Sequence, residues 1–530
     1  ILSKNFLKLI KVNLSNFDFE NANFDSKNNF SFEIDNKFKF KNIVLQSDIN
    51  LQQIKYKTED SFFNYFTKLN KIILFKNHEL NLNYNKDKLS IKGVGKIQLE
   101  EKFENIEYFI IKDKNYLNFT SDLLIENISL KKQVFLERHF PLMNDEINLN
   151  SHKLNINYQN KKLSLMGKGK IKIDNDFEQI NYFISKKKDK FSFNVDLNID
   201  KTHFIINELN YKKSDKTNTK LKIIGNFEEK KYLNLNNFSV IENDNKIKIT
   251  NLLLDKENLI IKIDKLDLNY VDSENKQNQF SIQKKEKNNY ELNGLTFNAN
   301  SLIKNLLKDN DEKSNKIFKN NVSLKLNLNE VYIDEIYFIK NLKGQLFIRD
   351  NKVREANISG FFKDKENIKF TIKTDNEGKK ITTLNSTWAK PLVNRYKFIK
   401  GFEEGYLDFY SSKKNGVSNS LLIIVNFKIK EIPVLARLLS LASLQGIADL
   451  LTGEGIRFTD FEMKFSNKKK LITIEELYAI GPSISILMEG YKLGELISLR
   501  GTLVPASTIN KTIASLPLIG DLLVGKKVGE

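Results

Sequence analysis

The chain has 530 residues and no cysteine, which excludes disulfides and thiolate zinc sites without fixing the redox compartment. Its formal net charge of +19, mostly from lysine, permits an anionic partner, but no compact basic cluster with interleaved aromatic residues occurs, so solvated lysines are the favoured interpretation. No run of 18 apolar residues occurs, so the sequence predicts no transmembrane helix within these residues.

The N-terminal part alternates apolar and polar residues from Phe6 to Lys57, which predicts strands with one apolar face. Apolar residues at spacings of three and four then predict a short helix over Asp60–Asn70. Beyond it, Leu80–Lys112 aligns without a gap with Leu154–Lys186, and 18 of the 33 positions are identical at an offset of 74. A duplicated unit of this length predicts a structure that grows along an axis.

Each predicted repeat contains a short helix followed by about four strands. The two repeats cover about 58–130 and 132–204, and the second helix is expected within Lys131–Met143. Two pairs of glycines lie inside the predicted strands, where glycine usually marks a bend or bulge. These pairs are Gly93 with Gly95 and Gly167 with Gly169.

The rest of the chain continues the strand pattern with weaker similarity. Strands are predicted at Leu221–Phe227, Tyr232–Ile241, Lys246–Leu254, Leu259–Tyr270, Val322–Leu328, Leu342–Asp350, Val353–Phe361, Lys369–Thr374, Gly405–Tyr410, Ser420–Ile429, Ile456–Phe465, Leu471–Ile480, Ser483–Tyr491 and Leu496–Val504. Short helices are predicted at Ser301–Lys308 and Ala389–Lys400, with Pro391 at the start of the second. Because roughly 25 twisted strands cannot stay in one flat open sheet, we predict an elongated curled antiparallel sheet, a repeating β-groove, with a few short helices.

The densest apolar run, Ile432–Gly455, interrupts this strand pattern. Its apolar residues change face at Gly446, which predicts two short amphipathic helices, and a further helical piece is predicted after Pro505. Together these pieces form a predicted C-terminal cap with apolar residues Leu435, Leu438, Leu439, Ile447, Leu450, Leu451, Ile513 and Leu516. Two interpretations stay open, namely helices packed under the end of the sheet, or a plug or membrane contact at the mouth of a groove.

The sequence shows no catalytic or metal-binding constellation, and neither enzyme activity nor a cofactor is predicted. The four histidines form no ligand spacing, and we interpret His78 and His152, at neighbouring but not identical places in the two repeats, as surface residues. Acidic pairs are interpreted as solvated positions at strand ends or turns. These pairs are Glu100 with Glu101, Glu228 with Glu229, Glu403 with Glu404 and Glu475 with Glu476.

The alternation along the strands is the feature that points to a function. In residues 191–199 the apolar side chains all face one way and the polar ones face the other. An apolar face of this extent must either close as a dry core or cover an apolar ligand. The residues predicted to line such a groove are Leu117, Phe119, Phe191, Phe193, Val195, Leu197 and Ile199.

The C-terminal sequence resembles a known family. The stretches PVLARLLSLAS and GIADLLTGEGI, followed by AIGPSISILMEG, RGTLVPASTIN and SLPLIGDLLVG, are similar to the C-terminal region of the AsmA-like superfamily, particularly its YhdP-type, TamB-related envelope proteins. The specific motifs cover roughly the last 140 residues. Elsewhere the chain is similar to this family only in its repeating strands.

The resemblance implies a repeating β-groove in a periplasmic protein, anchored in the inner membrane by an N-terminal helix that these residues do not include. It also implies transport of phospholipids between the inner and outer membranes, with other envelope proteins as possible partners at the ends. On this basis we divide the chain into a groove body, 1–430, and an AsmA-like C-terminal region, 431–530.

Three hypotheses follow for the function. The first is a lipid conduit with acyl chains in the groove and lysines near anionic head groups. The second is a structural or assembly factor whose edge strand pairs with an outer-membrane protein by strand addition. Nucleic-acid binding by the basic surface is the least favoured and is not part of the prediction.

Overall fold

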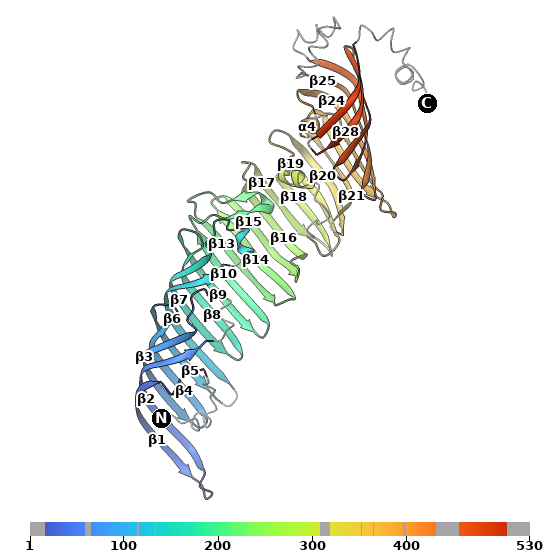
Figure 1. Ribbon diagram of the computed structural model, residues 1–530. Helices are drawn as coiled ribbons and strands as arrows, with labels where there is room; N and C mark the ends of the chain where they lie inside the picture. The colour runs from blue at the N-terminus through green and yellow to red at the C-terminus, as the bar shows by residue number, and fades with distance from the viewer. Residues whose placement is uncertain are drawn as a thin grey trace. The chain divides into compact units, whose positions relative to one another are not determined.

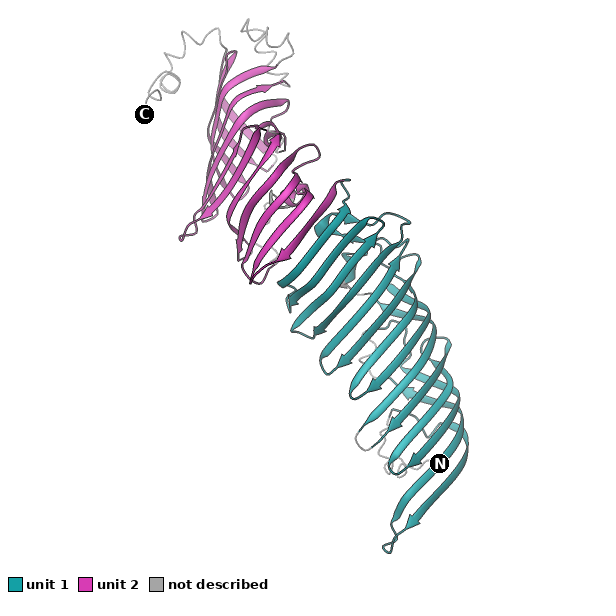
Figure 2. Cartoon of the chain, turned by 180° about the vertical axis from the view of Figure 1, so that it is seen from behind, with its two compact units in different colours: residues 1–275 teal, residues 276–530 magenta. Residues whose placement is uncertain are grey.

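The computed structural model describes residues 16–58, 65–113, 116–132, 134–307, 318–350, 352–363, 365–395, 399–430, 455–494 and 496–505. The chain forms two compact units, residues 1–275 and residues 276–530, which Figure 2 draws in different colours. Each unit is described by itself. The eight apolar residues of the predicted C-terminal cap lie in 431–454 and 506–530, outside the described residues.

Unit 1 is a ladder of antiparallel strands in which each strand pairs with the next along the chain (Figure 1). Its strands are β1 (Asn23–Ile34), β2 (Phe40–Lys57), β3 (Ile72–Asn85), β4 (Lys88–Gln98), β5 (Phe103–Lys112), β6 (Leu117–Lys131), β7 (Glu146–Gln159), β8 (Lys162–Lys172), β9 (Phe177–Lys187), β10 (Lys190–Ile199), β13 (Thr219–Glu228), β14 (Tyr232–Glu242), β15 (Asn245–Asp255) and β16 (Ile260–Val271). A separate two-stranded ribbon, β11 (Ile205–Ile206) with β12 (Tyr211–Lys212), flanks the short 3₁₀ helix η2 (Asn207–Leu209).

The sequence repeat has a direct structural counterpart in unit 1. Strands β7 and β8 begin and end 74 residues after β3 and β4, and β9 begins 74 residues after β5. One glycine of each pair, Gly95 or Gly169, lies opposite a bulge on the neighbouring strand, whereas Gly93 and Gly167 are regularly paired. The register shifts between Lys76 and Glu79 on β3 and between Asn150 and Lys153 on β7.

Unit 2 contains β17 (Gln277–Lys284), β18 (Asn289–Asn298), β19 (Val322–Tyr332), β20 (Phe338–Arg349), β21 (Lys352–Lys363), β22 (Glu366–Thr374), β23 (Lys380–Ser386), β24 (Phe402–Lys414), β25 (Val417–Ile429), β26 (Ile456–Lys468), β27 (Leu471–Ile480), β28 (Ile484–Leu493) and β29 (Leu496–Pro505). Pairing is antiparallel except between β18 and β19, which are parallel. Because parallel strands begin at the same end of a sheet, a long connection joins the end of β18 to the start of β19.

The helices are few and short in the described residues. They are α2 (Val134–Glu137), α3 (Asn300–Leu307) and α4 (Lys390–Arg395), which fall within or over the ranges predicted for them, with α4 including Pro391. The prediction of a helix over Asp60–Asn70 is wrong for residues 65–70. There Phe66 forms a β-bridge with Leu130, so the backbone pairs with β6 instead of with itself.

Strands therefore dominate the described residues, and the sheets are open and mostly antiparallel, which confirms the predicted mainly-β fold with a curled antiparallel sheet. In both units the register places apolar residues opposite apolar residues. In unit 2, for example, Leu407 lies opposite Ile424 and Ile424 lies opposite Phe461. Side chains opposite each other share a face of the sheet, so each unit has one apolar face.

Candidate functional site

The apolar face of unit 1 is the candidate site, and the strand register shows that it is continuous. Val195 lies opposite Tyr182 on β9 and Ile223 on β13, and the same row continues through Phe238 and Ile249. Each step places the next side chain about 5 Å away on the same side of the sheet. Apolar contact therefore continues from strand to strand without a polar break in this row.

All seven residues predicted to line a groove lie on this face. Phe119 on β6 lies opposite Tyr158 on β7, and the corresponding row reaches β10 through Leu163 and Lys186 at Phe191. The other residues of β10 in the set follow at every second position, as a strand requires. The structure thus brings together Leu117, Phe119, Phe191, Phe193, Val195, Leu197 and Ile199 on one face.

Burial on this face increases along each strand toward one margin. On β10, Phe191, Phe193 and Val195 are half-buried, whereas Leu197 and Ile199 are buried. The same step occurs on β13 to β16, where the buried row consists of Leu221, Val240, Ile247 and Leu268. The half-buried part of the face includes Ile223, Phe227, Leu233, Leu235, Phe238, Ile249, Leu252, Leu254, Ile260, Ile263 and Leu266.

The buried margin is covered by the segments that join the repeats. The segment after β10 places Phe204 against Phe140, with ring centroids 5.3 Å apart, and Tyr211 against Tyr270 at 5.9 Å. The Tyr270 hydroxyl also donates to the carbonyl of Leu209 at 2.8 Å. These segments bury one side of the apolar face and leave the other side half-exposed.

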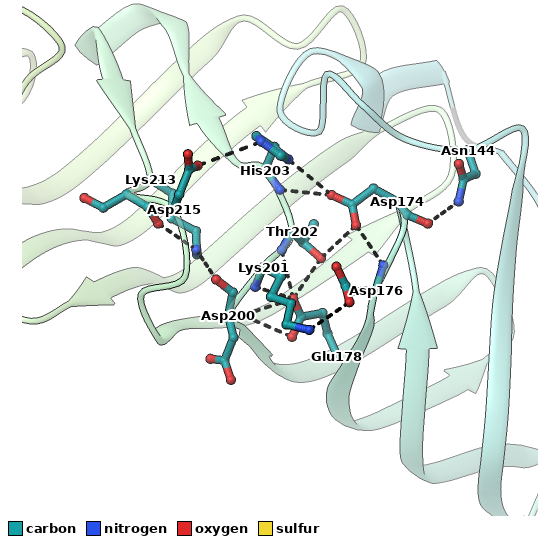
Figure 3. Close-up of polar contacts among 11 residues, drawn as sticks. Asn144, Asp174, Asp176, Glu178, Asp200, Lys201, Thr202, His203, Lys213 and Asp215 are labelled. Carbon is teal, nitrogen blue, oxygen red and sulfur yellow. Dashed lines mark hydrogen bonds and ion pairs between the residues drawn. The ribbon is translucent and has the colours of Figure 1, made fainter.

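Buried carboxylates hold these segments in place through hydrogen bonds to the backbone, and we call each such cluster a joint. Figure 3 shows the joint of the second repeat. The Glu178 carboxylate accepts the backbone N–H groups of Asp200, Lys201 and Thr202 at 2.9 to 3.0 Å, and the Thr202 hydroxyl at 3.0 Å. Asp174 accepts the N–H of His203 at 3.1 Å. Both carboxylates are buried, so these hydrogen bonds to charged acceptors hold the chain where it leaves β10.

The first repeat contains the same joint 74 residues earlier. Glu104 accepts the N–H of Glu126 at 2.9 Å, and Glu100 accepts the N–H of Ser129 at 2.7 Å. The interpretation of Glu100 as a solvated position is therefore wrong, because its carboxylate is buried against a backbone donor. The acidic residues retained at both repeat positions, 100 with 174 and 104 with 178, are the signal that could have revealed the joint.

His78 and His152 are also not surface residues, since their exposed fractions are 1% and 0%. The offset of 74 makes them equivalent, and each sits at a bulge opposite a glycine, Gly95 or Gly169. His78 Nε2 lies 2.9 Å from the carbonyl of Lys96, so Nε2 carries the proton and Nδ1 accepts from Tyr108 at 3.2 Å. The bulge places both histidine side chains on the buried side of the sheet, and sequence alternation alone does not predict this position.

Tyr108 and Tyr182 lie flat over glycines on the neighbouring strand. A Cβ added at Gly93 would overlap with the Tyr108 ring, and one at Gly167 would overlap with the Tyr182 ring. Phe193 lies over Gly225 in the same way, 2.7 Å from the site of an added Cβ. Burial raises the pKa of Tyr108 and Tyr182 to about 12, so both stay neutral. The glycines therefore let aromatic rings lie close against the middle of the face.

This packing yields a prediction for Gly167. The change Gly167→Ala should lower the free energy of unfolding by about 1–3 kcal/mol, because the methyl group displaces the Tyr182 ring. In a double-mutant cycle with Tyr182→Ala, the two losses should sum to more than the loss of the double variant. Urea unfolding of the four proteins measures both quantities, and additive losses would show that the ring and the glycine do not interact.

A second prediction concerns pH. Burial lowers the pKa of both His78 and His152 below the ordinary value of 6.5. Since the folded state then binds fewer protons than the unfolded state, the free energy of unfolding should fall as pH drops below about 6.5. Chemical unfolding between pH 7.5 and 5 measures this loss. The double variant His78→Gln with His152→Gln should lose less stability over the same interval, and an equal loss would contradict the assignment.

Among the described residues, no group of three or more His, Asp or Glu side chains could hold a metal ion. Within the same part of the chain, no helix is long and apolar enough to cross a membrane.

The fold and the face together define an open β-sheet protein with one continuous apolar face in each unit. No protein-family model matches the chain, and neither a curated protein nor a solved structure matches it. The resemblance to the AsmA-like superfamily consequently rests on the sequence motifs alone and stays a prediction. The division into residues 1–430 and 431–530 likewise stays a prediction.

Proposed function

We propose that this protein carries phospholipids along the apolar face of its sheet, between the inner and outer membranes of a bacterial envelope. The observation that carries the proposal is the half-exposed part of the face from β10 to β16. Each methylene group of an acyl chain that leaves water for such a surface contributes about 0.8 kcal/mol. A soluble protein rarely leaves this many large apolar side chains in water without a ligand or partner.

The half-exposed margin of the apolar face, on the side away from the buried margin, suits a phospholipid head group. Lys186 lies opposite Leu163 and Phe191, and its Nζ is 4.7 Å from the centre of the Phe191 ring. Lys112, at the equivalent place in the first repeat, lies opposite Leu89 and Leu117. A cation at the end of an apolar row would attract a phosphate while the acyl chains lie along the row.

The proposal places the protein in the periplasm and is neither enzymatic nor dependent on a cofactor. Its test is mass spectrometry of lipids that stay with the 530-residue chain through purification without detergent. We expect phospholipids in stoichiometric amounts. A lipid-free, monomeric and folded chain would contradict the conduit and favour the alternative, in which a strand edge pairs with a client protein.

A further inference from the structure

Among the described residues of unit 1, the most exposed aromatic cluster lies at the tip of the hairpin between β1 and β2. Strand β3 ends at Asn85, opposite Val44, so the hairpin continues beyond its neighbouring strand. Figures 1 and 2 both show it projecting at the end of the unit. The exposed fractions are 69% for Phe30, 89% for Phe38 and 60% for Phe40, and Phe32 and Ile34 are also exposed.

These side chains extend the apolar face of the sheet. Phe30 lies opposite Leu45, which lies opposite the buried Tyr84, so all three share that face. Phe32 packs edge-on against Phe40, with ring centroids 4.8 Å apart. The apolar face therefore continues into an exposed aromatic cluster at the tip of this hairpin.

The backbone of Phe38, in the turn between β1 and β2, is strained. Its φ of 55° is in the left-handed region, where glycine or asparagine is favoured and a bulky residue is strained. The Asp35 carboxylate accepts the N–H groups of Lys37 and Lys39, at 2.8 and 3.0 Å, and fixes this turn. A phenylalanine this exposed, in a strained turn, gains little from packing within the chain, which points to a contact outside it.

Lysine surrounds the cluster and indicates what that contact is. Lys27, Lys37, Lys39 and Lys41 outnumber the acidic Glu33 and Asp35, and Asp35 already pairs with Lys41 at 3.2 Å. Aromatic side chains favour the interface between head groups and acyl chains, and nearby lysines favour anionic lipids by about 1 kcal/mol each.

We propose that the β1–β2 tip, residues 30–41, inserts into the surface of an anionic phospholipid bilayer. The inference deepens the proposed function and rests on it for its role, because the tip joins the apolar face to a lipid source or acceptor. Binding of the tip to a bilayer can nevertheless be measured without any lipid transport.

The test is co-sedimentation of the 530-residue chain with vesicles of phosphatidylglycerol and phosphatidylcholine. The variant Phe38→Asn with Phe40→Ser should bind about tenfold more weakly, and Asn suits the left-handed turn, so folding is preserved. Lys37→Glu with Lys39→Glu should weaken binding about tenfold on anionic vesicles and leave binding to pure phosphatidylcholine nearly unchanged. As a matched control, Phe109→Ser removes an exposed aromatic residue from the polar face and should bind like the parent chain.

Three outcomes would overturn the inference. The first is that the parent chain does not bind vesicles, and the second is that the Phe38 and Phe40 variant binds them equally well. The third is that the parent chain forms a dimer in solution, does not bind vesicles, and becomes a monomer in this variant. A failure here leaves co-purified lipid unaffected, whereas failure of the conduit removes co-purified lipid and leaves vesicle binding intact. The two proposals are thus tested separately.

Discussion

The change Val195→Asp should remove at least about 90% of the lipid that co-purifies with the chain. Val195 is half-buried in the middle of the apolar face, between Tyr182 and Ile223. An acyl chain lying there would cover the new carboxylate, and burying an unpaired charge costs several kcal/mol, where 1.4 kcal/mol already lowers affinity tenfold. Quantitative lipid mass spectrometry per mole of protein measures the result.

The control is Ser192→Asp, which places the same charge on the same strand. Ser192 is exposed on the opposite, polar face, so this variant should retain its lipid. Both variants should unfold within about 2 kcal/mol of the parent chain, because water can reach both carboxylates in the lipid-free state. Equal lipid content in the two variants would exclude the apolar face as the carrier and favour strand addition.

The second large effect is expected at the repeat joint. The change Glu178→Ala should lower the free energy of unfolding by about 3–5 kcal/mol, because it leaves the buried Thr202 and its neighbours without their acceptor. Glu178→Gln should cost less, since an amide oxygen still accepts hydrogen bonds. Denaturant unfolding monitored by tyrosine fluorescence or circular dichroism measures both.

The equivalent position in the first repeat and a nearby acid serve as comparisons. Glu104→Ala should cost less than Glu178→Ala, because Glu104 holds the N–H of Glu126 where β6 continues as a strand. Asp176→Asn should change stability by less than about 1 kcal/mol, because its ion pair with Lys201 is solvent-exposed. A loss at Glu178 no larger than the loss at Asp176 would contradict the structural role of the joint.

Much of the fold could be predicted because alternation and repetition are local properties of the sequence. The predicted strand Leu221–Phe227, for example, lies inside β13. Strands β7 and β8 also have the bounds of β3 and β4, shifted by the repeat offset. Strands β17, β18 and β23 were missed. Their short apolar runs are broken by Asn, Gln, Thr and Ser, so neither the antiparallel hairpin of β17 with β18 nor the parallel pairing of β18 with β19 shows in the alternation.

The candidate site was predictable as a face but not in its details. One strand, residues 191–199, already separates apolar from polar side chains and predicts five of the seven lining residues, and the repeat adds Leu117 and Phe119. The joint could not be read in the same way, because the donors to Glu178 lie 22 to 24 residues away and meet it only through the register of two strands. The burial of His78 and His152 could not be predicted, because a bulge inverts the alternation of side chains at one position.

The agreement between the sequence offset and the strand bounds also makes length an adjustable property of unit 1. Each copy of the repeat contributes four neighbouring strands, so it extends the ladder by about 19 Å at a spacing of about 4.8 Å. Each copy has the same carboxylate joint near its C-terminal end, with Glu104 or Glu178 at equivalent places. A chain of this design can therefore become longer or shorter by gaining or losing whole copies of four strands.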